Sequence, residues 1–242
     1  MNATEFKTEF NLAYNNLASN QAPGLDEVEI SIYLTKAQNI LVDALYGEFE
    51  KSEEARRKLA NLVVTDRLAK ATLENPSSGD ITDTTVIPVA NILYPEYTTV
   101  YTPECDVRYI INEQVKMSSN ADTCIKGRFL KVQPVLHDEI DTIINNPFKF
   151  NIRRALRLDT SYNNIPYIEI LTKDNHIEYY QIRYIKTPKP IFIYDNTQYD
   201  DTIDGQTAPS TLIGYKPASL PETTHRQIVE IAAKLAYQDY KV

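Results

Sequence analysis

The spacing of hydrophobic residues changes along this 242-residue chain, from a helical repeat in its first quarter to an alternating repeat beyond its middle. Apolar residues recur three and four positions apart over 6–17 and again over 30–45. This spacing predicts two amphipathic helices, each with one buried face. Asp26, followed three positions later by Glu29, predicts a capping box at the start of the second helix.

A third helical segment is predicted after Ser52, whose side chain can cap it. Charged residues cover the side of this segment that faces water. Its apolar side carries Ala55, Leu59, Leu62 and Val63. Because only a short turn separates the second and third segments, we expect them to pack as an antiparallel helical hairpin. We expect the N-terminal helical part to cover residues 1–75.

The helical repeat ends in the breaker-rich stretch 75–80, and residues 76–107 have a different character. They are rich in Thr, Val and Tyr, and they contain Pro88, Pro95 and Pro103. Proline cannot donate a hydrogen bond to a sheet, so a long central strand is disfavoured here. We therefore expect residues 76–107 to form an extended, arm-like excursion.

Alternating apolar and polar residues dominate the next part, 108–220, which we expect to be β-rich. Strand-like stretches cover residues 108–117, 128–132, 165–171, 177–185 and 188–193, with a short helix at 138–145. The two stretches that flank the polar turn 173–176 predict a β-hairpin. The prolines at 188 and 190 indicate an edge strand.

A final helix is predicted over 221–242, with apolar residues spaced to pack back on the N-terminal helices. Together these patterns predict an α+β fold. It consists of an N-terminal helical hairpin or bundle, an inserted antiparallel β portion and a C-terminal helix.

Composition adds two features to this picture. The chain has 17 Tyr but no Trp, and its formal net charge is −8. Tyrosine combines a large apolar ring with a polar hydroxyl, and protein interfaces are enriched in it. A codon bias in an AT-rich genome is an alternative source of the tyrosines. On the interface interpretation, the candidate contact residues are Tyr94, Tyr97, Tyr101, Tyr237 and Tyr240.

The negative charge disfavours specific nucleic-acid binding, because such binding depends on clustered Lys and Arg. DNA could still pass such a surface without adhering to it. Aromatic and basic residues interleave at 179–184, as in a platform for single-stranded nucleic acid. A half-buried strand shows the same alternation and is the favoured interpretation.

Residues with catalytic or metal-binding potential are scattered. The histidines His137, His176 and His225 lie far apart, and the glycines do not form a phosphate-binding loop. The acidic stretch 200–204 fits a solvated turn better than a calcium loop. Cys105 and Cys124 are expected to be free thiols. We therefore expect a protein that is not an enzyme, with no catalytic, cofactor-binding or metal-binding residues.

The first residues lack the basic and apolar regions of a signal peptide, and no apolar run is long enough to span a membrane. We therefore expect a protein that is made and kept in a cytoplasm and has no membrane partner.

Three segments carry a resemblance to a known family: residues 24–38, residues 184–191 and residues 220–233. In this order, and following an N-terminal helix, they resemble the head-to-tail connector (adaptor or ring) proteins of short-tailed bacteriophages. The greatest similarity is to the crAss-like phages of gut Bacteroidales. The resemblance implies a virion structural protein in the neck or tail, assembled in the host bacterial cytoplasm.

The resemblance also implies partners. It implies a homo-oligomeric ring, a dodecamer, below the portal protein and above the next ring or tail hub protein. Such a ring joins the capsid vertex to the tail and lines the channel through which genomic DNA is ejected, without sequence-specific binding. The alternative function is a tail-associated carbohydrate- or receptor-binding module, which the tyrosine-rich strands would suit. An enzyme with a dispersed His or Asp site is a third hypothesis.

Overall fold

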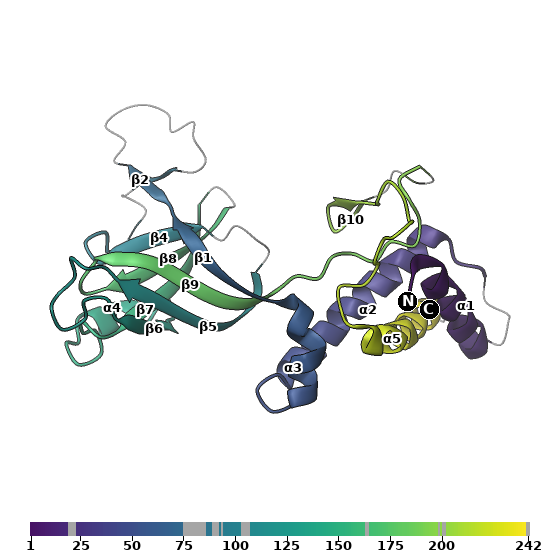
Figure 1. Cartoon of the computed structure of the whole chain (residues 1–242), viewed down its shortest axis with the longest axis horizontal. Helices are drawn as coiled ribbons and strands as arrows, with labels where there is room; N and C mark the ends of the chain where they lie inside the picture. Colours follow the sequence, from purple (N-terminus) through teal and green to yellow (C-terminus); the bar gives the residue numbers. More distant parts are fainter. Residues whose placement is uncertain are drawn as a thin grey trace. The chain divides into compact units, whose positions relative to one another are not determined.

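The computed structural model describes residues 1–18, 23–74, 86–88, 92, 94–102, 107–162, 165–197, 199 and 202–240. The chain divides into two compact units. A helical unit combines Met1–Val63 with Thr187–Val242, and a barrel unit comprises Val64–Lys186. The barrel unit is therefore inserted in sequence between the two halves of the helical unit, as the colours in Figure 1 show.

The helical unit contains α1 (Ala3–Ala18), α2 (Glu27–Gly47), α3 (Glu53–Leu59), η1 (Ala60–Leu62), η3 (Glu222–Thr224) and α5 (His225–Tyr240). Helix α5 packs against both α1 and α2. The predicted capping box is confirmed: the Asp26 side chain accepts from the first turn of α2, and Glu29 accepts from the Asp26 backbone. Ser52 accepts a hydrogen bond from Ala55 N at 3.3 Å and caps α3 as expected.

An extended segment, residues 187–194, runs along α2 without forming a strand, and its residues are buried except at 187 and 189. Three buried polar residues of α2 satisfy its backbone instead. Thr35 Oγ1 accepts from Ile191 N at 3.0 Å, and Ser31 Oγ accepts from Ile193 N at 3.2 Å. Gln38 donates to Lys189 O at 2.8 Å. The edge strand predicted at 188–193 is therefore wrong, because side chains of a helix take the place of a neighbouring strand.

Within the described residues, seven strands of the second unit close into a barrel in the order β1-β4-β8-β7-β6-β5-β9. Their bounds are β1 (Val63–Lys70), β4 (Thr98–Thr102), β5 (Val107–Met117), β6 (Phe129–Pro134), β7 (Ala155–Tyr162), β8 (Ile165–Thr172) and β9 (Ile177–Lys186). In the barrel, β1 with β4, β4 with β8, β7 with β8, β5 with β6 and β5 with β9 pair antiparallel, whereas β6 with β7 is parallel. A longer connection, which contains α4 (Ile140–Ile144), joins these two strands.

Two short pairs complete the described strands. A parallel pair joins β2 (Thr72–Glu74) to β3 (Val86–Pro88). In the helical unit, an antiparallel pair joins β10 (Thr202–Ile203) to β11 (Gln206–Thr207). Asp204 and Gly205 both have positive φ angles (49° and 72°), as a tight two-residue hairpin turn requires.

Side chains alternate between the two faces of the barrel wall. The main core fills the interior with residues such as Tyr101, Val115, Tyr180 and Ile182. On the outside of β7 and β8, a second cluster forms where Ile140 of α4 packs with neighbouring apolar residues. The barrel therefore has one outer side that is covered by its own chain.

Two further predictions from sequence are wrong. Residues 63–74 were expected to be helical, but they form β1 and β2. The β-branched residues Val63, Val64 and Thr65 favour a strand, and Leu68 is buried in the barrel core.

The expected hairpin of 165–171 with 177–185 does not form either. Strand β8 pairs with β4 and β7, whereas β9 pairs with β5. Both strands direct apolar residues into one interior, so they share a core without being neighbours. Of the expected arm at 76–107, residues 98–102 are strand β4 of the barrel, and most of the remainder lies outside the described residues.

Candidate interaction surfaces

The outer surface of β6, β5, β9 and β1 carries ordered rows of polar, cationic and aromatic side chains. We call it the cationic face. In the first row Lys116 lies in register with both Phe129 and Tyr179. The Arg67 guanidinium lies 4.1 Å from the centroid of the Tyr179 ring. The cationic face comprises Arg67, Asn112, Gln114, Lys116, Phe129, Lys131, Tyr179, Gln181 and Arg183.

Strand alternation explains why these residues share one face. The flanking residues Val115, Met117 and Tyr180 are fully buried in the barrel interior. Their sequence neighbours Lys116 and Tyr179 must therefore point outward. The pairing register then sets these outward side chains beside one another in rows across four strands.

Contacts within the cationic face hold its side chains in place. The Phe129 ring packs edge-on against the Tyr179 ring with centroids 6.3 Å apart. Lys116 lies 5.5 Å from the Tyr179 centroid and forms an ion pair with Glu178 at 3.1 Å. Cations over an aromatic ring are attracted by its negative face. Phe129 nevertheless remains 52% exposed, which is high for so apolar a side chain.

Beneath this face, the barrel core contains a buried ion pair. Arg157 Nη1 lies 3.2 and 3.3 Å from the two carboxylate oxygens of Glu113. The Tyr180 hydroxyl donates to Glu113 Oε2 at 2.7 Å. Burial, reinforced by the Glu113 charge, raises the pKa of Tyr180, so this hydroxyl stays protonated and donating. The cluster joins β5, β7 and β9 from inside the barrel.

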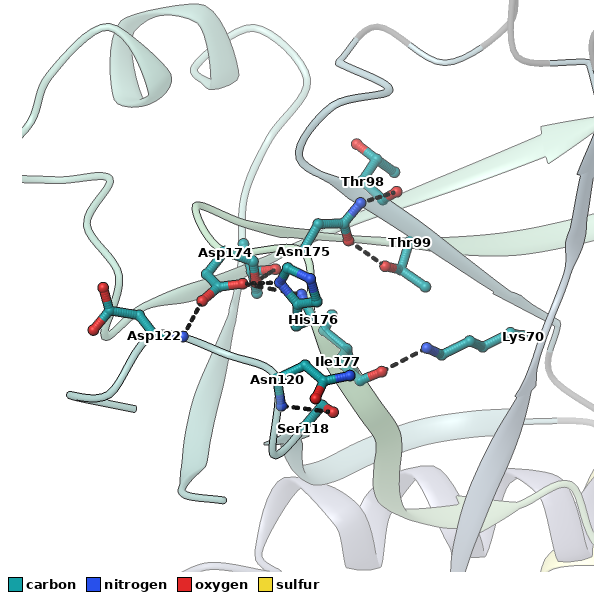
Figure 2. A network of polar contacts seen from close by, with 11 residues as sticks. Lys70, Thr98, Thr99, Ser118, Asn120, Asp122, Asp174, Asn175, His176 and Ile177 are labelled. Carbon is teal, nitrogen blue, oxygen red and sulfur yellow. Dashed lines mark hydrogen bonds and ion pairs between the residues drawn. The ribbon is translucent and has the colours of Figure 1, made fainter. Parts of the chain in front are cut away.

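At one end of the barrel, a polar network links loops to strands (Figure 2). Asp174, in the turn between β8 and β9, accepts from Asp122 N at 2.5 Å and contacts His176 Nδ1 at 2.6 Å. Burial opposes ionisation of Asp174, but the hydrogen bonds from Asp122 and His176 outweigh it and lower its pKa. Asn175 accepts from the Thr99 hydroxyl at 2.5 Å.

The same network includes β1. Lys70 Nζ donates to Ile177 O at 2.5 Å, and Ser118 N donates to His176 O at 2.8 Å. Burial lowers the pKa of Lys70. These bonds hold the turn after β8 against β1, β4 and the β5–β6 loop. The turn thus has its own support, although the two strands that it connects, β8 and β9, do not pair with each other.

An Asp–His pair such as Asp174–His176 can act as a general base when a nucleophile is bonded to the histidine. A catalytic role therefore requires a nucleophile beside it. Cys124 is an exposed free thiol in the neighbouring loop, and its backbone N–H bonds to Asp122 Oδ1 at 2.9 Å. In the described part of the chain, no hydrogen bond joins the Cys124 sulfur to His176. A nucleophile held by its base is the signature of covalent catalysis. The geometry instead supports a structural role for the turn.

The other candidate ligands stay apart. His137 Nε2 contacts Asp159 O at 2.9 Å, and His225 lies in the helical unit. Among the described residues, no group of three His, Cys, Asp or Glu side chains is arranged to hold a metal ion. Asp200, Asp201 and Cys105 lie outside those residues, and Asp204 sits exposed in the β10–β11 turn. None of the described helices is both long enough and apolar enough to cross a bilayer.

The predicted contact tyrosines have different environments. Tyr101 is fully buried against Tyr180 in the barrel core, with ring centroids 5.2 Å apart, so its side chain is not at a surface. Tyr94 donates to Asp141, and Tyr97 packs edge-on against Phe150 at 5.4 Å. Tyr240 is 47% exposed and Tyr237 is partly buried on α5. The four other than Tyr101 remain predicted contacts.

The cationic face was not predicted from the sequence as a surface. The alternation at 179–184 was its only visible trace, and that alternation belongs to one strand. Lys116, Lys131 and Arg67 join Tyr179 only through the register of three other strands. Single-sequence patterns do not specify that register.

Comparisons with known proteins show which family and which proteins this chain is similar to. The model of the family described as phage tail ring protein 3/4 matches residues 1–242. Ring protein 4/5 of Bacteroides phage crAss001 is 29% identical over 250 residues, covering 100% of this chain and 94% of that protein. Ring protein 3 of the same phage is 28% identical over 245 residues, covering 98% of this chain and 95% of that protein.

Proposed function

Since the chain belongs to the phage tail ring protein 3/4 family, we propose that it is a structural subunit of a closed ring in the neck or tail of a crAss-like phage. The family match over residues 1–242 is the observation that carries this proposal. The names of both relatives, ring protein 4/5 and ring protein 3, support it. According to this proposal, the protein acts in particle assembly and does not catalyse a reaction.

The ring is proposed to hold twelve copies below the portal, to contact the portal protein and the next ring or tail hub protein, and to line the DNA channel. A net charge of −8 supports passage of DNA, because a negative wall repels phosphate. A ring needs two different surfaces on each subunit, so that one copy can contact the next in a closed series. A chain with two unlike compact units can supply them.

Imaging of the intact particle tests this function. Cryo-EM of virions should locate this chain as a closed ring of repeated copies between the capsid vertex and the tail, and the map should give the copy number. Mixing the purified chain with portal assemblies should give a larger species by light scattering. A chain that is absent from the virion, or that stays monomeric with the portal, would overturn the proposal.

A further inference from the structure

The net charge of this chain is unevenly divided between its two units. The helical unit has 17 acidic and 11 basic residues, a net charge of −6, whereas the barrel unit has 16 and 14, a net charge of −2. Most of the net negative charge of the chain therefore belongs to the helical unit, because the barrel unit has more basic residues to balance its acidic ones. A positively charged surface on the barrel would be complementary to it.

The cationic face is such a surface. Arg67, Lys131 and Arg183 are exposed on it, and among the described residues no carboxylate lies within ion-pair distance of these three. Arg183 is held by the Thr65 hydroxyl at 3.1 Å, and Arg67 by the Tyr179 ring. Their positions are thus set before any partner arrives, which lowers the entropy cost of binding.

We propose that the cationic face of one copy binds the acidic helical unit of a second copy of this chain. This inference rests on the proposed ring function and names the partner of one ring contact. The contact joins unlike surfaces, so it can repeat from copy to copy and close into a ring. Exposed Phe129 supplies an apolar anchor within a charged surround, an arrangement typical of protein interfaces.

A nucleic acid is the competing partner, and the geometry disfavours it. Stacking of bases needs an open aromatic face. The Tyr179 ring has Arg67 at 4.1 Å from its centroid and Phe129 in edge contact, so on this face the exposed Phe129 ring stands without an open aromatic neighbour on which a second base could stack. The side-chain amides of Gln114 and Gln181 bond to each other at 3.0 Å, so they are not directed at a ligand. The charge of the whole chain also repels phosphate.

The test is zero-length crosslinking with a carbodiimide, which joins lysine amines to carboxylates. Full-length chain labelled with ¹⁵N is mixed with unlabelled chain, so that links between copies carry both isotopes. We expect mixed-isotope links from Lys116 and Lys131 to carboxylates of residues 1–63 or 187–242. Their yield should fall as salt is raised, because exposed charge pairs are screened.

A double variant sharpens this experiment. R67Q/R183Q removes two cations of the face and keeps both reporter lysines. It should weaken self-association roughly tenfold, as expected for the loss of two exposed charge pairs. R153Q/R154Q is the matched control, since it removes the same charge from the exposed loop before β7 and should leave the links unchanged. Equal thermal melting of both variants excludes a folding defect.

Three results would overturn the inference. One is mixed-isotope links that join barrel to barrel only. Another is equal self-association of R67Q/R183Q and the control. The third is binding of duplex DNA that R67Q/R183Q alone abolishes. If one of these results is obtained while wild-type virions contain the ring, this contact is refuted and the ring function stands. Absence of any ring in wild-type virions would refute the function itself.

Discussion

At the scale of single residues, the buried carboxylate Glu113 is the most consequential side chain of the barrel. It accepts hydrogen bonds from both Arg157 and the Tyr180 hydroxyl. Glu113→Ala removes the buried counter-charge of Arg157, which keeps only the exposed Asp159 carboxylate at 3.3 Å from Nε, and leaves the Tyr180 hydroxyl without its acceptor. We therefore expect a loss of about 3–5 kcal/mol in the free energy of unfolding. Urea denaturation measures it. Asn112→Ala, one position along β5 and exposed, should change stability by no more than about 0.5 kcal/mol, and an equal loss there would contradict the role of Glu113.

His225 gives the helical unit a dependence on pH. The ring is buried, Nδ1 lies 3.0 Å from the Met1 amino group, and Nε2 donates to Leu220 O at 3.1 Å. Burial, opposed in part by the Leu220 bond, lowers the pKa of His225 below its ordinary value of 6.5. A lowered pKa means that the unfolded chain binds the proton first. Stability of the helical unit should therefore be complete above about pH 6.5 and decline as pH falls toward the folded-state pKa.

Denaturation of the helical unit at pH 7.5 and pH 5.5, followed by helical circular dichroism, measures this effect. His225→Gln removes the titrating group, so the variant should lose the part of the pH dependence that falls in this range. A wild-type chain that becomes more stable at pH 5.5 would show that the sign is wrong.

At the scale of elements, side chains of α2 support the extended segment 187–194. Thr35→Val keeps the size of the side chain but leaves Ile191 N without its acceptor at a buried site. An unsatisfied buried donor costs about 1–3 kcal/mol, and we expect that loss in unfolding free energy. Thr8→Val on α1 is the control, because the Thr8 hydroxyl is exposed and bonds only within its own helix. Equal effects of the two variants would argue against this support.

The sequence predicted these elements unequally. The repeats of α1, α2 and α5 were recognised because one face of each helix is buried for several turns. Strands β5 and β9 were recognised from their alternation. The pairing of the strands could not be predicted. Buried residues such as Ile170 of β8 and Ile182 of β9 give the same apolar pattern whether their strands are neighbours or lie on opposite sides of a barrel. The role of Ser31 and Thr35 was missed, because hydroxyls on the buried face of a helix show no partner in a sequence.

At the scale of the whole molecule, the α+β fold class and the family could be predicted from the sequence. The residues that form interaction surfaces were harder to predict. The resemblance at 24–38, 184–191 and 220–233 agrees with the family match. Tyr101 shows what amino-acid composition cannot predict. The enrichment in tyrosine suggested an interface, but the Tyr101 ring is buried in the barrel core. The residues of the cationic face come from four strands, and only the pairing of these strands brings them together on one surface.

The insertion of the barrel unit leads to the last prediction. The chain enters the barrel at Val64 and leaves it at Lys186. Strands β1 and β9 are neighbours where the barrel closes, and the Arg183 contact with Thr65 places the first and last strands of the unit side by side. A continuous segment with its own core and adjacent ends has the anatomy of an independent domain.

We therefore expect residues 64–186, produced alone, to fold and to unfold in one cooperative transition. Dispersed amide signals in a ¹H–¹⁵N spectrum and a sigmoidal urea curve would support this. Glu113→Ala should shift that curve by the same free energy in the isolated unit as in the full chain, because all of its described partners lie within 64–186. A collapsed spectrum, or a much larger effect in the isolated unit, would mean that the barrel depends on the helical unit for its stability.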